Sequence, residues 1–368
     1  MTMIAHYVGL DVHKETITIA DAKAGRDPAR LVGTIPNDNP KLLKRLVKLG
    51  PRETISCCYE AGPTGYGLYR FLKTSGIQCE VIAPTLIPRQ AGKRVKTDKF
   101  DALKAARCHR SGDLTPIWVP DEQAEALRDL VRAREDAKAT ERAARHRLSK
   151  FFLRQERRYS GGRPWTGMYL EWARVQKFAH DAQSRVLREY LHVVESATAT
   201  VERLDLDIAE LVPSSSLNPL VKALQALKGV RLLTAAGIAV EVGDLHRFRR
   251  ASNFMSFVGM GVAERSTGDQ RRQFSITKTG NGHVRRLLVE AAWAYRHPPK
   301  MGNDLRKRSE GLPPKILEIA WKAQDRLHRR YRRLRARRKP HQVVIVSLAR
   351  ELAGFVWAVG QDIELPAV

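Results

Sequence analysis

The first 120 residues alternate between short apolar runs and segments with helical spacing. Residues 4–21, "IAHYVGLDVHKETITIAD", hold an apolar run, a polar break and an alternating stretch, which predict two antiparallel strands with Asp11 ending the first. "ETISCCYEA" (53–61) predicts a strand that ends on Glu60, and "CEVIAP" (79–84) predicts another, with a helix between them. Strands that alternate with helices in this way predict an α/β sheet domain over residues 1–120.

The pattern changes at residue 121. Residues 121–212 carry charged, alanine-rich windows with apolar residues at helical spacing and little strand signal. This predicts long helices, as a hairpin or coiled coil, broken near "SGGRPWTG" (160–167). A solvated helical spacer explains the same pattern equally well. "PSSSLNP" (213–219) is expected to be a linker.

Residues 220–368 predict a third, mainly α domain. "LQALKGVRLLTAAGIAVEVGDLHRF" predicts a helix, a glycine-centred turn and a second helix. "FVGMGVAERSTGDQRRQFSITKTGNGHVRRLLVEAAWAY" predicts a glycine-rich loop region that leads into a helix. "VVIVSLARELAGFVWAV" predicts a strongly apolar closing helix.

Composition bounds the class of protein. The chain has 368 residues, 43% of them hydrophobic, and no run of about 18 apolar residues, so a membrane span is not expected. The first residues contain an aspartate and lack a small-residue cleavage site, which argues against a secretory signal. The four cysteines, Cys57, Cys58, Cys79 and Cys108, show no metal-binding spacing and are expected to be reduced, mostly buried thiols in a cytoplasmic protein.

The net charge of +26 changes this picture most. So large a positive charge favours a polyanionic partner, since each neutralised phosphate releases counterions, and nucleic acid is the working hypothesis. Residues 300–339 alone hold fifteen Lys or Arg against four acids and end in "RRYRRLRARRK". A solvated helix face explains that basic run as well.

Four acids stand out against this basic background. Asp11 and Glu60 lie at predicted strand ends, and Asp98 and Asp101 lie three apart in "KTDKFDALKAAR". A helix that begins near Thr97 would place the last two on one face. Clustered acids repel one another unless a cation lies between them, and Mg²⁺ prefers such oxygen ligands. Helix caps and salt bridges explain each acid singly, so the pattern leaves both interpretations open.

Three separated motifs resemble a known family. "YVGLDVHKETITIAD", "YEAGPTGYGLYRFL" and "KTDKFDALKAAR" are similar to the RuvC-like (ribonuclease H-like) domain of DEDD transposases from bacterial insertion sequences, insertion-sequence family one-hundred-and-ten. The stretch that begins "FVGMGVAERSTG" resembles the second domain of the same family. The resemblance implies that Asp11, Glu60, Asp98 and Asp101 are catalytic acids that bind Mg²⁺.

The resemblance also implies a nucleophilic serine in "ERSTGDQRRQ" (264–273). On pattern alone such a segment is an ordinary turn. Relatives commonly have Ser-Ser-Gly or Ser-Gly here, whereas this chain has Ser266-Thr267-Gly268, so the register is open by one residue. We choose Ser266, because a primary hydroxyl attacks phosphorus with less crowding than the β-branched threonine.

Basic residues near the serine complete the expected site. Nucleic-acid contacts are assigned to Arg271, Arg272, Lys278, Arg285 and Arg286. A solvated basic loop is the other interpretation of the first two. His13 and His283 are assigned no catalytic role, because each is more often structural or in contact with phosphate.

Three functional hypotheses follow. The first is a transposase, a site-specific recombinase that acts through a covalent phosphoserine and Mg²⁺, with element junction and target DNA as substrates. The family implies a structured guide (bridge) RNA, and recombination of several strands favours a homo-oligomer, a dimer or tetramer, in the nucleoid-associated cytoplasm. The second is a RuvC-like, Mg²⁺-dependent, structure-specific nuclease. The third is a non-enzymatic nucleic-acid scaffold.

Overall fold

The computed structural model describes residues 3–84, 87, 97–267 and 270–365. The chain divides into two compact units, Met1–Val119 and Pro120–Val368.

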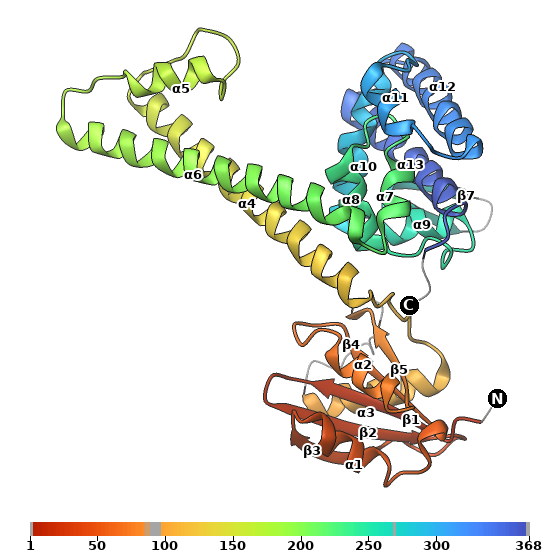
Figure 1. The fold of residues 1–368 in the computed structure, drawn as a ribbon. Helices are drawn as coiled ribbons and strands as arrows, with labels where there is room; N and C mark the ends of the chain where they lie inside the picture. Colours follow the sequence, from red (N-terminus) through yellow and green to blue (C-terminus); the bar gives the residue numbers. More distant parts are fainter. Residues whose placement is uncertain (1–2, 85–86, 88–96, 268–269, 366–368) are drawn as a thin grey trace. The chain divides into compact units, whose positions relative to one another are not determined.

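The first unit is built on a mixed five-stranded sheet in the order β3-β2-β1-β4-β5 (Figure 1). β1 pairs antiparallel with β2 and β2 with β3, whereas β1, β4 and β5 run parallel. The antiparallel first pair and the strands that end near Asp11 and Glu60 were predicted correctly. β3 was not predicted. The strands are β1 His6–Val12, β2 Thr16–Lys23, β3 Arg30–Pro36, β4 Ile55–Glu60 and β5 Gln78–Ile82.

Two helix layers cover this sheet. One face packs against α1 (Asn39–Leu46) and α2 (Gly67–Thr74), whose leucines join Leu10 and Tyr59 in one buried core. The opposite face packs against α3 (Asp98–Ser111), where alanines of the helix and of β2 form a second buried cluster. The 3₁₀ turn η1 (Arg52–Thr54) leads into β4.

Small residues let α3 approach the sheet closely. A Cβ on Gly9 of β1 would stand 2.3 Å from the carbonyl oxygen of Ala102 and 2.4 Å from the backbone nitrogen of Ala106. No side chain can occupy that space, so only glycine fits at this position of β1. The close contact fixes the height of the helix over the end of the strand.

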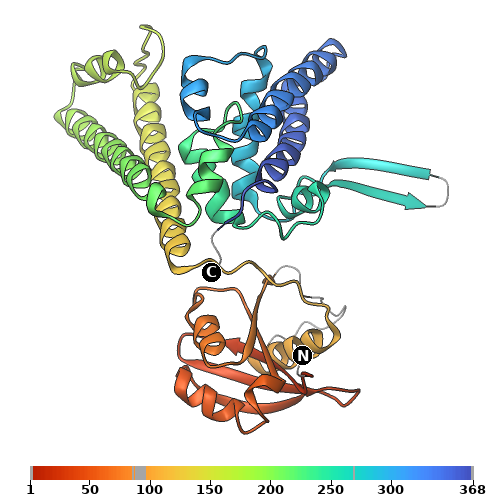
Figure 2. The same ribbon diagram turned by 45° about the vertical axis from the view of Figure 1, so that its right-hand side comes forward.

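The second unit begins with a long helical hairpin. α4 (Glu122–Arg154) and α6 (Asp181–Leu211) lie side by side in both ribbon views, with the short α5 (Gly167–Arg174) at the tip (Figure 2). Arg134 bonds Asp205 at 2.7 Å, and Thr198 donates to Glu141 at 3.3 Å, so residues further along α4 meet residues earlier in α6. The helices are therefore antiparallel, and the predicted break between them is confirmed. The segment predicted as a linker holds most of the 3₁₀ turn η3 (Val212–Ser214) and the start of α7 (Asn218–Leu224).

The rest of the second unit is mainly helical. α13, the closing apolar helix, packs against α9, α10 and α12. Within the described residues α13 is the one helix that is long and apolar enough to cross a membrane, but half of its apolar window is buried inside this unit, as in a core helix. The helices are α7 Asn218–Leu224, α8 Leu232–Val242, α9 Ala251–Phe257, α10 Gly282–Ala292, the 3₁₀ turn η4 Trp293–Arg296, α11 Asn303–Ser309, α12 Pro314–Ala336 and α13 His341–Gly360.

The predicted glycine-rich loop is wrong in one respect. β6 (Val262–Thr267) and β7 (Gln270–Ile276) form an antiparallel two-stranded hairpin that projects from the helices (Figure 2). Neighbours on its strands, such as Glu264 with Arg265 and Phe274 with Ser275, are both exposed. None of the hairpin side chains that the structure describes is buried, in accord with a sequence that lacks the apolar alternation that normally predicts strands.

Candidate metal centre and serine hairpin

Asp11 and Glu60 end adjacent parallel strands. Leu10 pairs with Tyr59 in the sheet register, so the two acids follow the last registered pair on β1 and β4. Side chains alternate along a strand, and both Gly9 and Cys58 face α3, where the Cys58 thiol contacts the carbonyl oxygen of Ala105. Asp11 and Glu60 therefore belong to the face of the sheet that α3 covers.

The first turn of α3 brings the other two acids to this face. Thr97 is the N-cap, with its hydroxyl accepting from the backbone N–H of Phe100 at 3.4 Å, so the prediction of a helix that begins at this threonine is confirmed. Asp98 and Asp101 both lie in the first turn. The positive end of the helix dipole favours negative charge there.

His13 connects two of the acids. Its Nε2 lies 3.2 Å from Asp11 Oδ2 and 3.5 Å from Asp98 Oδ1. One ligand atom from each of the three residues falls within 4.8 Å of the others, a spacing that could hold a metal ion. Sequence reasoning gave His13 no role, although its position two residues after Asp11 was a usable signal.

The surroundings of Asp11 raise the pKa of its carboxyl. Partial burial raises the pKa of the Asp11 carboxyl, His13 lowers it, and the negative charges of Asp98 and Asp101 raise it again. Asp101 is thus close enough to act on Asp11 electrostatically. A carboxylate made harder to ionise by burial and by neighbouring acids is stabilised when a cation binds beside it.

These contacts connect three of the four predicted acids, whereas Glu60 is placed by strand register. Asp11 and Asp98 meet at His13, and Asp101 acts on Asp11 from the same helix turn. Glu60 is exposed at the end of β4, next to Asp11 by strand register. The carboxylate oxygens and the imidazole nitrogen suit a divalent ion.

A second polar group in the first unit imitates a catalytic arrangement. His109 Nε2 lies 2.8 Å from the Ser56 hydroxyl, and its Nδ1 lies 3.7 Å from Glu80. Burial lowers the pKa of His109 to about 4, and Ser56 is itself buried. A nucleophile must reach its substrate, so this buried pair has a structural role.

The predicted nucleophile lies on the serine hairpin, which we define as residues 262–276. Ser266 of β6 is paired with Arg271 of β7, close to the two residues that join the strands. The side chains of Ser266 and Arg271 lie outside the described part of the structure. Arg272 is exposed on β7. Lys278, two residues after the end of β7, is also exposed and has a backbone φ of 58°.

The two remaining predicted contact residues are held within the second unit. Arg285 donates from Nη1 to the carbonyl oxygen of Val258 at 2.9 Å. Arg286 donates to Glu135 of α4 at 2.5 Å and to Glu290 of its own helix at 2.9 Å. These contacts tie α10 to α9 and to the long hairpin, and a nucleic-acid role for the two arginines stays a prediction.

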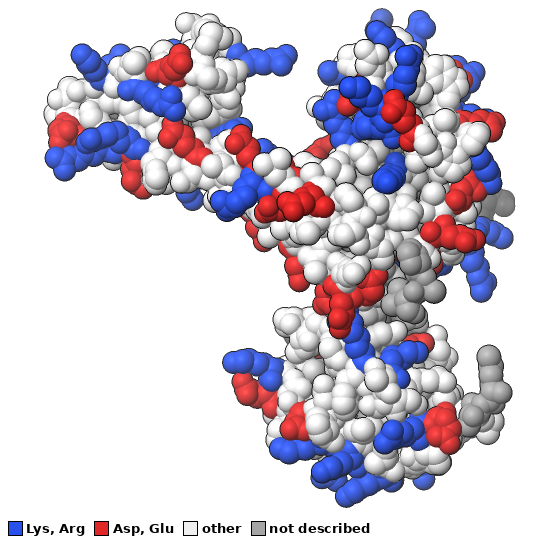
Figure 3. Space-filling model, viewed as in Figure 1, with Lys and Arg blue, Asp and Glu red and all other residues white. Residues whose placement is uncertain are grey.

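Basic side chains are widely distributed. In the space-filling view Lys and Arg are spread over both units and interleaved with acids (Figure 3). The net charge of +26 therefore does not lie on one patch of this face. A specific phosphate site would therefore depend on a local group of arginines.

Comparison with known proteins decides the family. Residues 8–155 match the DEDD transposase model of IS110 elements, and residues 221–305 match the model described as "Transposase IS116/IS110/IS902 family". A protein of Sinorhizobium fredii named "Putative transposase y4qE" is 45% identical over 97% of this chain and 88% of its own length. The chain belongs to this transposase family.

Another relative supports the same assignment. The transposase for insertion sequence element IS1533 of Leptospira borgpetersenii is 33% identical over 90% of this chain and 97% of its own length. The protein is thus a DNA transposase of an IS110-type insertion sequence, an enzyme whose partner is DNA. The acids that the first family model covers include Asp11, Glu60, Asp98 and Asp101.

Proposed function

We propose that this transposase recombines DNA through a covalent phosphoserine on Ser266 and a Mg²⁺ centre at Asp11, Glu60, Asp98 and Asp101. The observation that carries the proposal is the meeting of Asp11, His13 and Asp98 within 4.8 Å at the start of α3. Divalent ions bound by such acids polarise phosphoryl oxygens and lower the pKa of a hydroxyl nucleophile. Residues 1–120, 121–212 and 220–368 are proposed as the functional domains.

The four acids would hold Mg²⁺, and the ion would supply positive charge beside the reacting phosphate. Asp11 and Glu60 are fixed by the strands, whereas Asp98 and Asp101 are fixed by the helix that Thr97 caps. His13, in contact with two of the carboxylates, keeps their oxygens turned toward one point. Such preorganisation spares the active site from rearranging as charge develops.

Ser266 supplies the nucleophile. Its Oγ forms a bond to phosphorus, its proton passes to a base, and the bond from phosphorus to one deoxyribose oxygen breaks, with that oxygen taking a proton. A hydroxyl of the new DNA partner then attacks the phosphoserine and releases the serine. One phosphodiester is exchanged for another, so no ATP is required. Arg271, Arg272 and Lys278 contact the DNA backbone.

A guide RNA and a homo-oligomer complete the proposal. A structured RNA would choose the target by base pairing and leave the protein to hold backbones, which accords with a charge of +26 spread over both units. The serine hairpin and the acids would meet in one composite site, between subunits of a dimer or tetramer. The complex would act in the cytoplasm, associated with the nucleoid.

Covalent trapping tests the serine. The full-length protein, purified from its native host with bound RNA, is mixed with Mg²⁺ and labelled DNA that carries the element junction. Denaturing gels compare wild type with Ser266→Ala and Thr267→Ala. We expect a protein–DNA adduct that is lost only with Ser266→Ala.

The other outcomes are equally informative. An adduct lost only with Thr267→Ala would move the nucleophile by one residue. If the wild-type protein cuts the DNA but forms no protein–DNA adduct, the result would contradict the covalent mechanism and favour hydrolysis by water.

A further inference from the structure

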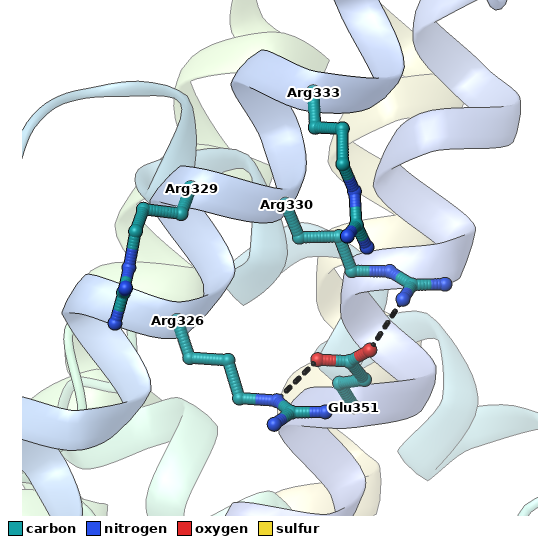
Figure 4. A pocket seen from close by; sticks show the side chains of 5 residues that line it. All are labelled: Arg326, Arg329, Arg330, Arg333 and Glu351. Atoms are coloured by element: carbon teal, nitrogen blue, oxygen red, sulfur yellow. Dashed lines mark hydrogen bonds and ion pairs between the residues drawn. The ribbon is translucent and has the colours of Figure 1, made fainter.

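Four arginines line one cavity between α12 and α13, on elements other than those of the metal centre and the serine hairpin. The cavity has a volume of about 360 Å³ and is lined by Arg326, Arg329, Arg330, Arg333 and Glu351 (Figure 4). Four arginines and one glutamate leave a formal charge of +3 on its walls. So strong a positive potential in a hollow favours an anion.

Helical spacing places these arginines in a row. Arg326, Arg330 and Arg333 lie four and then three residues apart on α12, which puts them on one face of the helix, with Arg329 beside them. From first to last the row extends about 10 Å along the helix axis. It faces α13, which supplies Glu351.

Glu351 forms the inner wall of the cavity. Its Oε2 accepts from Arg326 Nε at 2.9 Å and its Oε1 from Arg330 Nη1 at 2.7 Å, while Ser347 accepts from Arg330 Nε at 3.0 Å. The Glu351 side chain is only 14% exposed, whereas Arg326 is 66% exposed. The Glu351 carboxylate thus orients the guanidinium groups of Arg326 and Arg330 from the buried side of the cavity and leaves their other sides toward solvent.

Donors remain at the mouth of the cavity. Within the residues that the structure describes, Arg333 has no ion-pair partner. Arg326 donates to Glu351 from Nε, which leaves its two terminal nitrogens for a second acceptor. Arg329 is 74% exposed and pairs with Asp325 one turn earlier on the same helix, a contact that is weak in water.

We propose that this arginine cavity binds consecutive phosphates of the DNA backbone. Guanidinium groups match phosphate oxygens in pairs, and a row about 10 Å long spans several of the closely spaced charges of duplex DNA. DNA is also the partner that the family establishes for this protein. The inference goes beyond the proposed function, because it requires neither a cation nor chemistry at Ser266.

Salt-dependent binding to the full-length protein tests the cavity. Fluorescence anisotropy with a labelled duplex of the element junction, in EDTA, compares wild type with the double variant Arg329→Gln/Arg333→Gln at several salt concentrations. Loss of two phosphate contacts should reduce the slope of log K against log salt by about 1.8. The matched control is Arg185→Gln/Arg188→Gln on α6, where Arg185 pairs with Asp181 as Arg329 pairs with Asp325.

A charge change of opposite sign gives a second test. Glu351→Gln removes the negative charge inside the cavity but keeps an amide oxygen that still accepts from a guanidinium group, so it should tighten binding to the duplex by about 3- to 10-fold at low salt. Thermal melting of every variant checks that the fold is intact, and a structured RNA of matched length is titrated in parallel.

Three results would overturn the proposal. One is a slope for the cavity variant equal to that of the α6 control. Another is weaker DNA binding by Glu351→Gln in a protein that melts like wild type. The third is a reduced slope with the RNA alone, which would assign the cavity to RNA.

Discussion

Gly9 of β1 lies so close to Ala102 of α3 that an added Cβ would stand 2.3 Å from that residue's carbonyl oxygen. Two residues after Gly9 comes Asp11, and one residue before Ala102 comes Asp101. The same contact that packs the helix on the sheet therefore brings the acids of the two elements together.

Gly9→Ala is expected to destabilise the first unit. The atoms that the new methyl group meets are backbone atoms of α3, which cannot turn away, so we expect a loss of at least about 2 kcal/mol and a displaced helix. Denaturant unfolding measures the effect. Gly67→Ala is the control, because a Cβ there meets nothing within 4 Å and should leave stability nearly unchanged. Equal stability of the two variants would contradict the close packing.

Asp101→Asn should abolish strand exchange while binding of DNA and RNA survives. The substitution keeps the size of the side chain but removes a negative charge from the proposed metal centre. Mutation of a residue that only supports a metal ligand typically lowers metal affinity or activity by about 10–100-fold. We therefore expect loss of a ligand itself to lower the recombination rate by more than about 100-fold. Recombination assays measure it, with the exposed Glu15→Gln as a nearby control. Retained recombination would remove Asp101 from the metal centre.

Local signals explain how much of this site the sequence could predict. The strands that end on Asp11 and Glu60 follow from apolar runs, and the cap at Thr97 follows from its position before a helical pattern. His13 was missed, because its contact with Asp98 depends on how α3 packs on the sheet. That packing is a tertiary relationship that residue spacing does not contain.

The second unit gave weaker signals for a different reason. The hairpin that carries Ser266 has no buried side chain among those that the structure describes, and its sequence has no apolar alternation that would distinguish it from a loop. Arg286 is predicted to contact phosphate, and its ion pair with Glu135, on a helix far away in the chain, had no signal in the sequence. Long-range ion pairs of this kind become visible only in the folded structure.

His13→Gln should weaken metal binding without unfolding the protein. His13 contacts Asp11 and Asp98 from an exposed position, so the variant loses orientation of the carboxylates rather than packing. A partner of this kind is worth about 10–100-fold in metal affinity. Calorimetric titration with Mn²⁺ compares the variant with His180→Gln on an exposed part of the second unit. A variant that binds the ion as tightly as wild type would show that His13 is only a surface residue.

Arg286 and Arg272 are expected to differ in what they support. Arg286→Gln breaks the pair with Glu135 between α10 and α4 and should cost about 1 kcal/mol of stability, in addition to reducing the salt slope of DNA binding by about 0.9 through loss of its predicted phosphate contact. Arg272→Gln, on the exposed hairpin, should leave stability unchanged and reduce the salt slope by about 0.9. Unfolding and anisotropy titrations on both variants measure the two effects, and an unchanged salt slope for Arg286→Gln would leave that arginine a structural role alone.

His109 should make the protein less stable in acid. Burial lowers its pKa to about 4 from the ordinary value of 6.5, so between these values the unfolded chain binds a proton that the folded protein excludes. The stabilisation is fully present above pH 6.5 and is lost as the pH falls toward 4, by at most about 3 kcal/mol. Denaturant unfolding at pH 8 and pH 5 measures this loss. His109→Gln keeps a polar group near Ser56 but does not titrate, so its stability should fall less over this interval than that of wild type or of the exposed His192→Gln. An equal loss of stability between pH 8 and pH 5 in all three proteins would show that the folded protein already binds a proton on His109 at pH 5.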